Sequence, residues 1–563
     1  MRRLALALLI MGCSGKDNGD GGDDGPPDPK GWSIEIDMSP LDRFVAPATA
    51  TAWEVSGIAT ASAGLAGLEV AGAAASPDER GAFAASVAVA PGLTRVPILA
   101  RDAAGHERRG DRTLLAARFL PDSAHNAGAA ALVLDDAILA SLGAGLASQA
   151  GGVDVAGEIL TRDILSQDDR CVTWPTAASQ GAVAVSLVQD RGDLWLRIRI
   201  PSLDVRFAGT CRGVIGQIPV AGAFGGTLDV WTRLAAKPPA DGACLTAFGH
   251  TSPEVVVSGW RFDVWGTGGP LQNWIIQLFQ GEKSSEARNQ IAGEVAARAD
   301  AMLAEKLANI SVFDRTSQLD MLGRPVAMHL CLGALEKVSG KLIARVAAAA
   351  SSAGTRAAPG APQLDGAAPA VAGKELLLDA NLVAQLLFAA WRDGGLARGA
   401  PDVDLGVLQA LVPALYERHP DATVATVKID AELPPLVRAT PRMRDALGDL
   451  SIELGDVMVD LEVEGERIFR FGVNLKLALE LVPSGGKLQP RVVDTAAEVA
   501  LLDELLDGPD AALEQAVKLQ IGKAAASLLG DTAAIALPDL PGLGAPIDVV
   551  PDAGGRYLHV KLQ

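Results

Sequence analysis

Two stretches of this 563-residue chain, ALVLDDAILASL at residues 131–142 and ELLLDANLVAQL at residues 375–386, align with each other without a gap. In each copy an aspartate is placed like a helix N-cap and is followed by apolar residues at helical spacing. A later pair keeps the same order, because VDVAGEIL at 153–160 corresponds to VDLGVLQAL at 403–411. Ordered repetition of this kind indicates two duplicated modules.

Each copy continues into segments in which apolar and polar residues alternate, as when Leu196, Ile198 and Ile200 alternate with Trp195, Arg197 and Arg199. Such alternation gives a strand one buried face and one exposed face, so we expect antiparallel sheets. The segments are LWLRIRIPSLDVRFAG and EVVVSGWRFDVWG in the first copy, and TVATVKIDAELPPLV, LSIELGDVMVDLEVEG and RIFRFGVNLKLALELV in the second.

We expect each copy to close with a long amphipathic helix, over about residues 271–310 in the first copy and about 497–529 in the second. The apolar residues that share one helix face are Ile291, Val295, Ala299, Met302, Leu303, Leu307 and Ile310 in the first, and Leu513, Val517, Ile521, Ala524 and Leu528 in the second. A helix that is apolar along most of its length needs an apolar partner along that length.

The order helix, long strands, long helix, given twice, resembles the tubular lipid-binding (TULIP) superfamily, which includes bactericidal permeability-increasing protein. Three stretches carry the resemblance: LLLDANLVAQLLFAAWRDGGL, the LPP turn at 433–435, and LQNWIIQLFQGEKSSEARNQIAGEVAARADAMLAEKL. The resemblance implies two α+β modules, at 121–350 and 374–563, joined by a linker at 351–373. In each module a curved antiparallel sheet would wrap around a long amphipathic helix.

The resemblance also implies apolar tunnels that bind lipids or other hydrophobic ligands, with transfer between membranes as an extension. The candidate tunnel-lining residues are Ile138, Leu139, Leu142, Ile291, Val295, Met302, Leu382, Leu386, Val517 and Ile521. The basic tip with which the antibacterial member grips lipopolysaccharide has no counterpart in this acidic chain. The alternative is a structural or adhesive envelope protein, in which these residues pack solid cores and the modules bind protein partners.

The N-terminus, MRRLALALLIMGC, has two arginines, a short apolar run and a small residue before Cys13, which is typical of an export signal. IMGC resembles the lipobox of bacterial lipoproteins, so we expect residues 1–13 to end at a lipidated Cys13 that anchors the chain to a membrane. Residues 14–31 carry glycine, aspartate and proline and are expected to form a disordered linker. Ser14 favours the outer membrane of a bacterial cell envelope over retention at the inner membrane.

Residues 32–119 offer short alternating segments separated by turn residues, which predicts an all-β sandwich. AFAASVAVAPGLTRVPILARDAAGHE resembles bacterial immunoglobulin-like repeats, which are spacers or adhesive units.

Composition narrows the classes of function. The net charge of −19 and the lack of a basic cluster argue against a nucleic-acid partner. Beyond Cys13 an even number of cysteines predicts two disulfides, and among three possible connectivities we favour Cys171 with Cys211 and Cys244 with Cys331. Six scattered histidines and no metal or nucleophile motif indicate neither a catalytic centre nor a metal site or cofactor, so we do not expect an enzyme.

Overall fold

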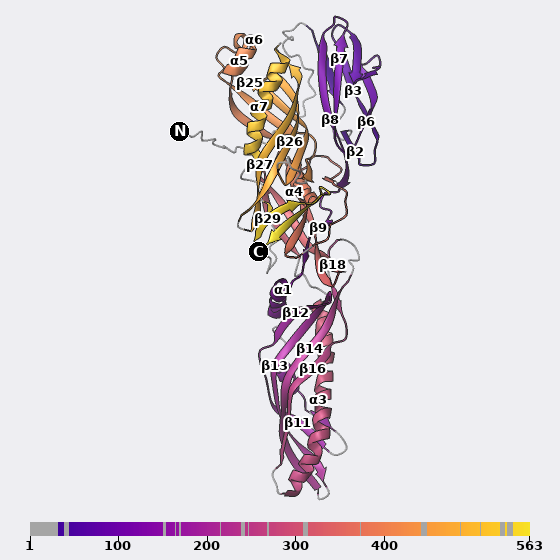
Figure 1. The fold of residues 1–563 in the computed structure, drawn as a ribbon, viewed down its shortest axis with the longest axis vertical. Helices are drawn as coiled ribbons and strands as arrows, with labels where there is room; N and C mark the ends of the chain where they lie inside the picture. Colours follow the sequence, from indigo (N-terminus) through magenta and orange to yellow (C-terminus); the bar gives the residue numbers. More distant parts are fainter. Residues whose placement is uncertain are drawn as a thin grey trace.

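The computed structural model describes residues 32–563 with gaps at 39–43, 150–153, 164, 168–170, 214–215, 238–242, 246, 267–269, 308–313, 372, 441–447, 485, 507, 530–534 and 537–543. Cys13 and the expected linker at 14–31 lie outside the described residues. The molecule is elongated, with the first copy at one end and the second copy at the other, where the N-terminal strands lie beside it (Figure 1).

The expected fold class is wrong, because the protein is mainly β, with about half of its residues in strands and far fewer in helices. The clearest local error lies at residues 497–504, expected to begin a long helix. They belong to strand β27 (Lys487–Glu504), and only α7 (Asp510–Leu529) is helical. Ala, Glu and Leu favour helices, but pairing with β26 (Glu466–Ser484) overrides that preference. Ala497 is buried and Glu498 exposed, as strand alternation requires.

The first copy is built on one sheet in which β13 (Asp193–Gly213) and β14 (Gly216–Ala236) are the long central strands. Its other strands are β10 (Ser166–Gln167), β11 (Cys171–Gln180), β12 (Ala184–Asp190), β15 (Phe248–His250) and β16 (Glu254–Gly266). Leu196, Ile198 and Ile200 are buried, which confirms the alternation predicted for β13. The helices are α1 (Asp136–Gln149), α2 (Val155–Leu160) and the 38-residue α3 (Pro270–Leu307), which runs beside β14 and β16 (Figure 1).

The second copy repeats this plan around β25 (Leu450–Val463) and β26. The remaining strands of its sheet are β22 (Arg398–Asp404), β23 (Val424–Ala431), β24 (Leu436–Ala439), β27 and β28 (Ile535–Ala536). Its helices are α4 (Ala380–Arg392), α5 (Gly406–Leu411), α6 (Pro413–Arg418) and α7, which packs on β27.

A central sheet joins the two copies through β9 (Asn126–Val133) and β21 (Glu375–Asp379), which pair antiparallel. Leu132 pairs with Leu376, and these residues are equivalent in the sequence repeat, so a local two-fold axis passes near this pair. The order across this sheet is β17 (Arg315–Met321), β18 (Arg324–Val338), β19 (Lys341–Ser351), β9, β21, β30 (Tyr557–Leu562) and β29 (Pro546–Pro551).

The two predicted N-cap aspartates both cap helices, but their surroundings differ. Asp135 Oδ1 accepts a hydrogen bond from the Ile138 amide at 3.0 Å, and Asp379 Oδ1 accepts one from the Asn381 amide at 3.0 Å. Asp379 is also fully buried and forms an ion pair with Arg556 at 2.7 Å. All residues of α4 from 380 to 391 are buried, whereas α1 keeps an exposed side.

The N-terminal strands form two small sheets around a core of their own. One sheet contains β1 (Ile34–Met38), β3 (Ala52–Ala61) and β6 (Ala82–Ala88), and the other β2 (Val45–Pro47), β8 (Glu107–Leu120), β7 (Gly92–Asp102), β4 (Leu65–Val70) and β5 (Ala73–Ala75). The segment expected as a linker adds β20 (Ala361–Gln363), a buried strand paired with β8.

This N-terminal unit is docked on the second copy. Arg108 forms an ion pair with Asp503 and donates to the Leu502 carbonyl at 3.0 Å. Leu433 and Leu436 of the second copy belong to the apolar core of the N-terminal unit. Charged and apolar contacts across this boundary mean that the unit does not stand apart as a free spacer.

Candidate functional site

All ten residues predicted to line tunnels belong to, or pack against, one continuous apolar cluster that spans both copies. Eight of them are buried, and Met302 and Ile521 are half-buried. Leu382 and Leu386 lie on α4, which is enclosed by protein along its whole length, so they serve as core.

Val295 and Met302 of α3 line a partly enclosed cavity of about 270 Å³ in the first copy. The cavity lies between α2, α3, β13 and β14. Its apolar lining is completed by Val155, Ile198, Ile200, Val230, Ala299 and Ala301. The period-two alternation of β13 creates this wall, since every second side chain of the strand points inward.

Charged side chains gather at the border of the cavity. Asp154 caps α2 by accepting a hydrogen bond from the Gly157 amide at 2.7 Å. Glu158 of α2 forms an ion pair with Arg298 of α3, and one turn away Arg162 pairs with Glu294 at 2.5 Å. The cavity therefore combines an apolar wall with an ion-paired rim that holds α2 against α3.

Aromatic side chains continue the apolar interior along the same sheet. The ring centroids of Phe207 and Phe224 are 6.0 Å apart, and those of Phe224 and Trp260 are 5.5 Å apart. Gly222 makes room for this packing, because a Cβ there would lie 2.4 Å from the ring of Phe207. The Trp260 indole donates to Ser284 at 3.0 Å, which ties β16 to α3.

The outer face of this sheet carries a row of uncharged side chains. Trp174, Ala208, Ala221 and Trp265 are successive cross-strand partners on β11, β13, β14 and β16. The tryptophans at the two ends of the row are 38% and 51% exposed. Tryptophan is enriched at membrane–water interfaces, because its ring is largely apolar while its indole N–H is polar.

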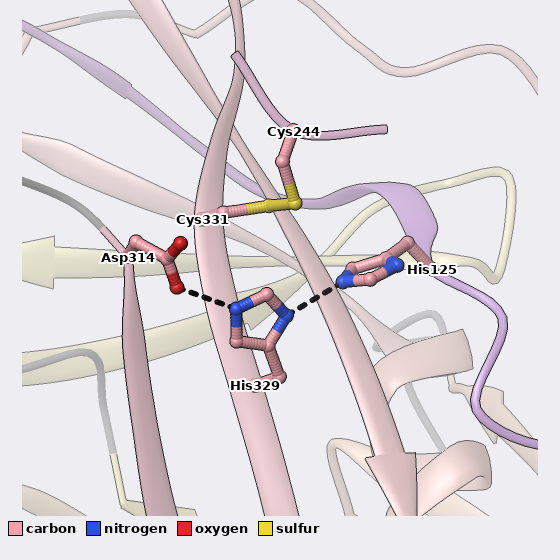
Figure 2. The surroundings of a disulfide bond; sticks show 5 residues. All are labelled: His125, Cys244, Asp314, His329 and Cys331. Carbon is pink, nitrogen blue, oxygen red and sulfur yellow. Dashed lines mark hydrogen bonds and ion pairs between the residues drawn. A yellow bond between two sulfur atoms is a disulfide. The ribbon is translucent and has the colours of Figure 1, made fainter. Parts of the chain in front are cut away.

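The disulfides Cys171–Cys211 and Cys244–Cys331 are both present. Cys171 and Cys211 are cross-strand partners on β11 and β13. Beside the second disulfide lies a histidine pair, with His125 Nε2 2.7 Å from His329 Nδ1 and His329 Nε2 2.6 Å from Asp314 Oδ1 (Figure 2).

This cluster is not predicted from the sequence, because most of its members are far apart in the chain. His329 and Cys331 do share a strand face, since they are two residues apart on β18, and that spacing was the only local signal. Cys244 and His125 reach the same place through the pairing of distant strands.

Among solved structures, the crystal structure of a lipopolysaccharide binding protein is similar to this chain, with a TM-score of 0.39 and 13% sequence identity. The similarity covers 79% of this chain and 99% of that chain. No protein-family model and no curated protein matches the sequence. At this score the structural similarity carries no argument about function, and the tubular-superfamily resemblance stays a prediction. None of the helices that the structure describes has the length and apolar character needed to cross a membrane.

Proposed function

We propose that the first copy binds a hydrophobic ligand of the lipid class in the cavity between α2, α3, β13 and β14. The observation that carries this proposal is the cavity itself, at about 270 Å³ with a mainly apolar lining. Apolar cavities of roughly 150 Å³ already hold benzene, and ligand pockets begin at roughly 300 Å³. The space suits a segment of an acyl chain, whose polar end would lie at the charged rim.

The rim supports this orientation. Arg298 lies at the border of the cavity on the same helix as Val295 and Met302. A carboxylate or phosphate group would compete with Glu158 for Arg298, since guanidinium groups bind such anions well. An acidic chain can in this way hold one anionic headgroup without a basic surface.

A matched pair of variants of α3 tests the cavity. Ala301 lines the cavity and is exposed, so Ala301→Trp places an indole at its mouth with little demand on the core. Ala304 is exposed on the same helix and does not line the cavity, so Ala304→Trp is the control. We expect Ala301→Trp to weaken uptake of a fluorescent fatty acid about 10-fold or more, equivalent to about 1.4 kcal/mol, while Ala304→Trp leaves it unchanged.

Equal binding by the two variants would show that the cavity is not the binding site. Absence of fatty-acid uptake by the unaltered chain, with no lipid in organic extracts of the purified protein, would favour the rival function as a solid-core scaffold.

The two exposed tryptophans on the outer face of the sheet can be tested in the same assay, with lipid supplied from vesicles. Replacing Trp174 and Trp265 with alanine should slow uptake from vesicles and leave uptake of dispersed fatty acid unchanged.

We further propose that the chain is an exported lipoprotein held in the outer membrane by acyl chains on Cys13. The ordered elements of MRRLALALLIMGC support this proposal. Two or more acyl chains would anchor the protein stably and keep the cavity near a lipid source. Labelled palmitate should enter the full chain expressed in bacteria and not its Cys13→Ser variant. Equal labelling of both would contradict the anchor.

A further inference from the structure

Four side chains of the residue types that commonly bind transition metals, histidine and cysteine, lie together at the junction of the two copies. One ligand atom from each of His125, Cys244, His329 and Cys331 lies within 4.8 Å of the other three. They come from the segment before β9, the segment before β15 and two positions of β18. Figure 2 shows the two histidines beside the disulfide. Two thiolates with two imidazoles are the donor set of tetrahedral Cys2His2 zinc sites.

The positions of these residues do not depend on the disulfide alone. The Leu245 amide donates to the Leu332 carbonyl at 2.6 Å, which fixes the backbone next to Cys244 against β18. Gly333 allows this close approach, because a Cβ there would lie 3.2 Å from the Ala243 carbonyl oxygen. On the other side, Gln385 donates to the Ala124 carbonyl at 2.9 Å, next to His125.

A further contact is typical of metal-binding histidines. His329 directs Nδ1 toward the cluster and holds Nε2 2.6 Å from the Asp314 carboxylate. Histidine ligands of metals commonly donate their second ring nitrogen to a carboxylate, which fixes the ring and makes the ligating nitrogen more basic. Asp314 therefore supplies an outer partner that a disulfide by itself does not require.

We propose that His125, Cys244, His329 and Cys331 form a redox-gated binding site for a tetrahedral divalent metal ion of the zinc class. While the sulfurs are joined, neither is a thiolate and the site is closed. A dithiol reductant opens it: two electrons and two protons pass to the sulfurs, the S–S bond breaks, and the reductant becomes a disulfide. Metal binding then releases the two thiol protons to solvent.

To accept the ion, the two sulfurs would have to move apart, and the ring nitrogens of His125 and His329, now 2.7 Å apart, would have to separate. Zinc bonds of about 2.3 Å to sulfur and about 2.0–2.1 Å to nitrogen place tetrahedral ligand atoms roughly 3.3–3.8 Å apart. The ion would take the place of the ring hydrogen between His125 and His329, and the neutral His125 ring would then carry its hydrogen on Nδ1. Breaking the S–S bond lets the sulfurs separate to the spacing that the ion requires.

The experiment titrates the full chain with cobalt(II), a spectroscopic substitute for zinc, before and after reduction by a water-soluble phosphine. The phosphine becomes its oxide with oxygen from water, while the sulfurs take two electrons and two protons. We expect the reduced chain to bind one cobalt ion per molecule, with the charge-transfer and d–d absorption bands of a tetrahedral thiolate complex. The oxidised chain should show no such bands.

Variants identify the ligands. Cys331→Ser should abolish the bands, and His125→Ala or Asp314→Asn should weaken binding about 10-fold or more. The double variant Cys171→Ser/Cys211→Ser removes the other reducible pair and should keep the bands. His250→Ala is the matched histidine control, since His250 pairs with Asp300 at 3.0 Å and is not one of the four clustered residues.

Three results would overturn the proposal. The first is the absence of cobalt bands in a reduced chain whose circular dichroism is that of the folded protein. The others are bands that persist in Cys331→Ser and equal cobalt binding by the oxidised chain. If Cys331→Ser does not fold, Asp314→Asn decides in its place, because Asp314 lies at the surface. Unchanged cobalt affinity in that variant would contradict the role of the cluster. These readouts are independent of lipid binding.

Discussion

The two copies share an order of elements and differ in how the space between helices and sheet is occupied. The second copy encloses α4 completely and carries the N-terminal unit on its sheet. The first copy retains a cavity between α3 and β13 and contains both disulfides. The two halves of one architecture thus differ in their described features: an enclosed helix in the second copy, and a partly enclosed cavity with two disulfides in the first.

The largest expected effect concerns the buried aspartate that distinguishes the second copy. Arg556→Ala leaves the fully buried Asp379 carboxylate without its ion-pair partner, which should cost about 3 to 5 kcal/mol in the free energy of unfolding. Asp135→Ala, at the equivalent cap of the first copy, should cost only about 1 kcal/mol. Urea unfolding followed by circular dichroism measures both, and similar losses would remove this contrast between the copies.

A pH effect is expected where the N-terminal unit meets the second copy. Burial raises the pKa of Asp456 from 3.8 to about 7. The positive charge of Arg112, whose Nη2 lies 2.8 Å from Asp456 Oδ2, acts in the opposite direction. The negative charges of Glu432 and Asp111 raise the pKa further. Between these two pKa values the folded state holds a proton that the unfolded state has lost. Stability should therefore fall as pH rises from about 4 to about 7, by up to about 4 kcal/mol, and then level off.

Asp456→Asn is the variant that tests this effect. An amide cannot ionise, so the variant should lose most of this pH dependence and be more stable than the unaltered chain at pH 8. Urea unfolding at intervals from pH 4 to pH 8 gives the comparison. A variant with the same pH profile as the unaltered chain would show that Asp456 does not titrate in this range.

The smallest expected difference between the copies is that between two leucines at equivalent positions of the repeat. Leu386 lies in the enclosed α4 and Leu142 in α1, and both are buried. Truncation of a buried leucine to alanine costs about 2 to 5 kcal/mol, depending on how far the surroundings can collapse. Leu386→Ala should fall near the upper end and Leu142→Ala about 1 to 2 kcal/mol lower. The reverse order in thermal or urea unfolding would mean that the first copy is packed as tightly as the second.

Much of the local structure could be predicted because its signals are short-range. The alternation around Ile198 and the caps at Asp135 and Asp379 depend on residues within one strand or one helical turn. The favoured cysteine pairing was also found, although the sequence did not exclude the other connectivities. Residues 497–504 were assigned wrongly because their composition favours a helix, while the neighbouring strand supplied the hydrogen bonds that made them β.

The candidate site residues show the same difference between local signals, which could be predicted, and long-range contacts, which could not. Val295 and Met302 were identified as candidates from helical periodicity, but the same periodicity also selected Leu386, which is core. A helix face can be recognised as apolar from sequence, whereas the space between that face and its partner depends on how distant strands are placed.

By itself the sequence determined the alternating strands, the helix caps, the acidic balance and the even set of cysteines beyond Cys13, and it predicted the repeat. Only the tertiary structure decided that Leu132 pairs with Leu376, that the N-terminal unit docks on the second copy, and that His125 meets Cys244 and β18. The reason is physical: periodicity and capping arise from neighbouring residues, but cavities, docking surfaces and ligand clusters arise from contacts between segments that are distant in the chain.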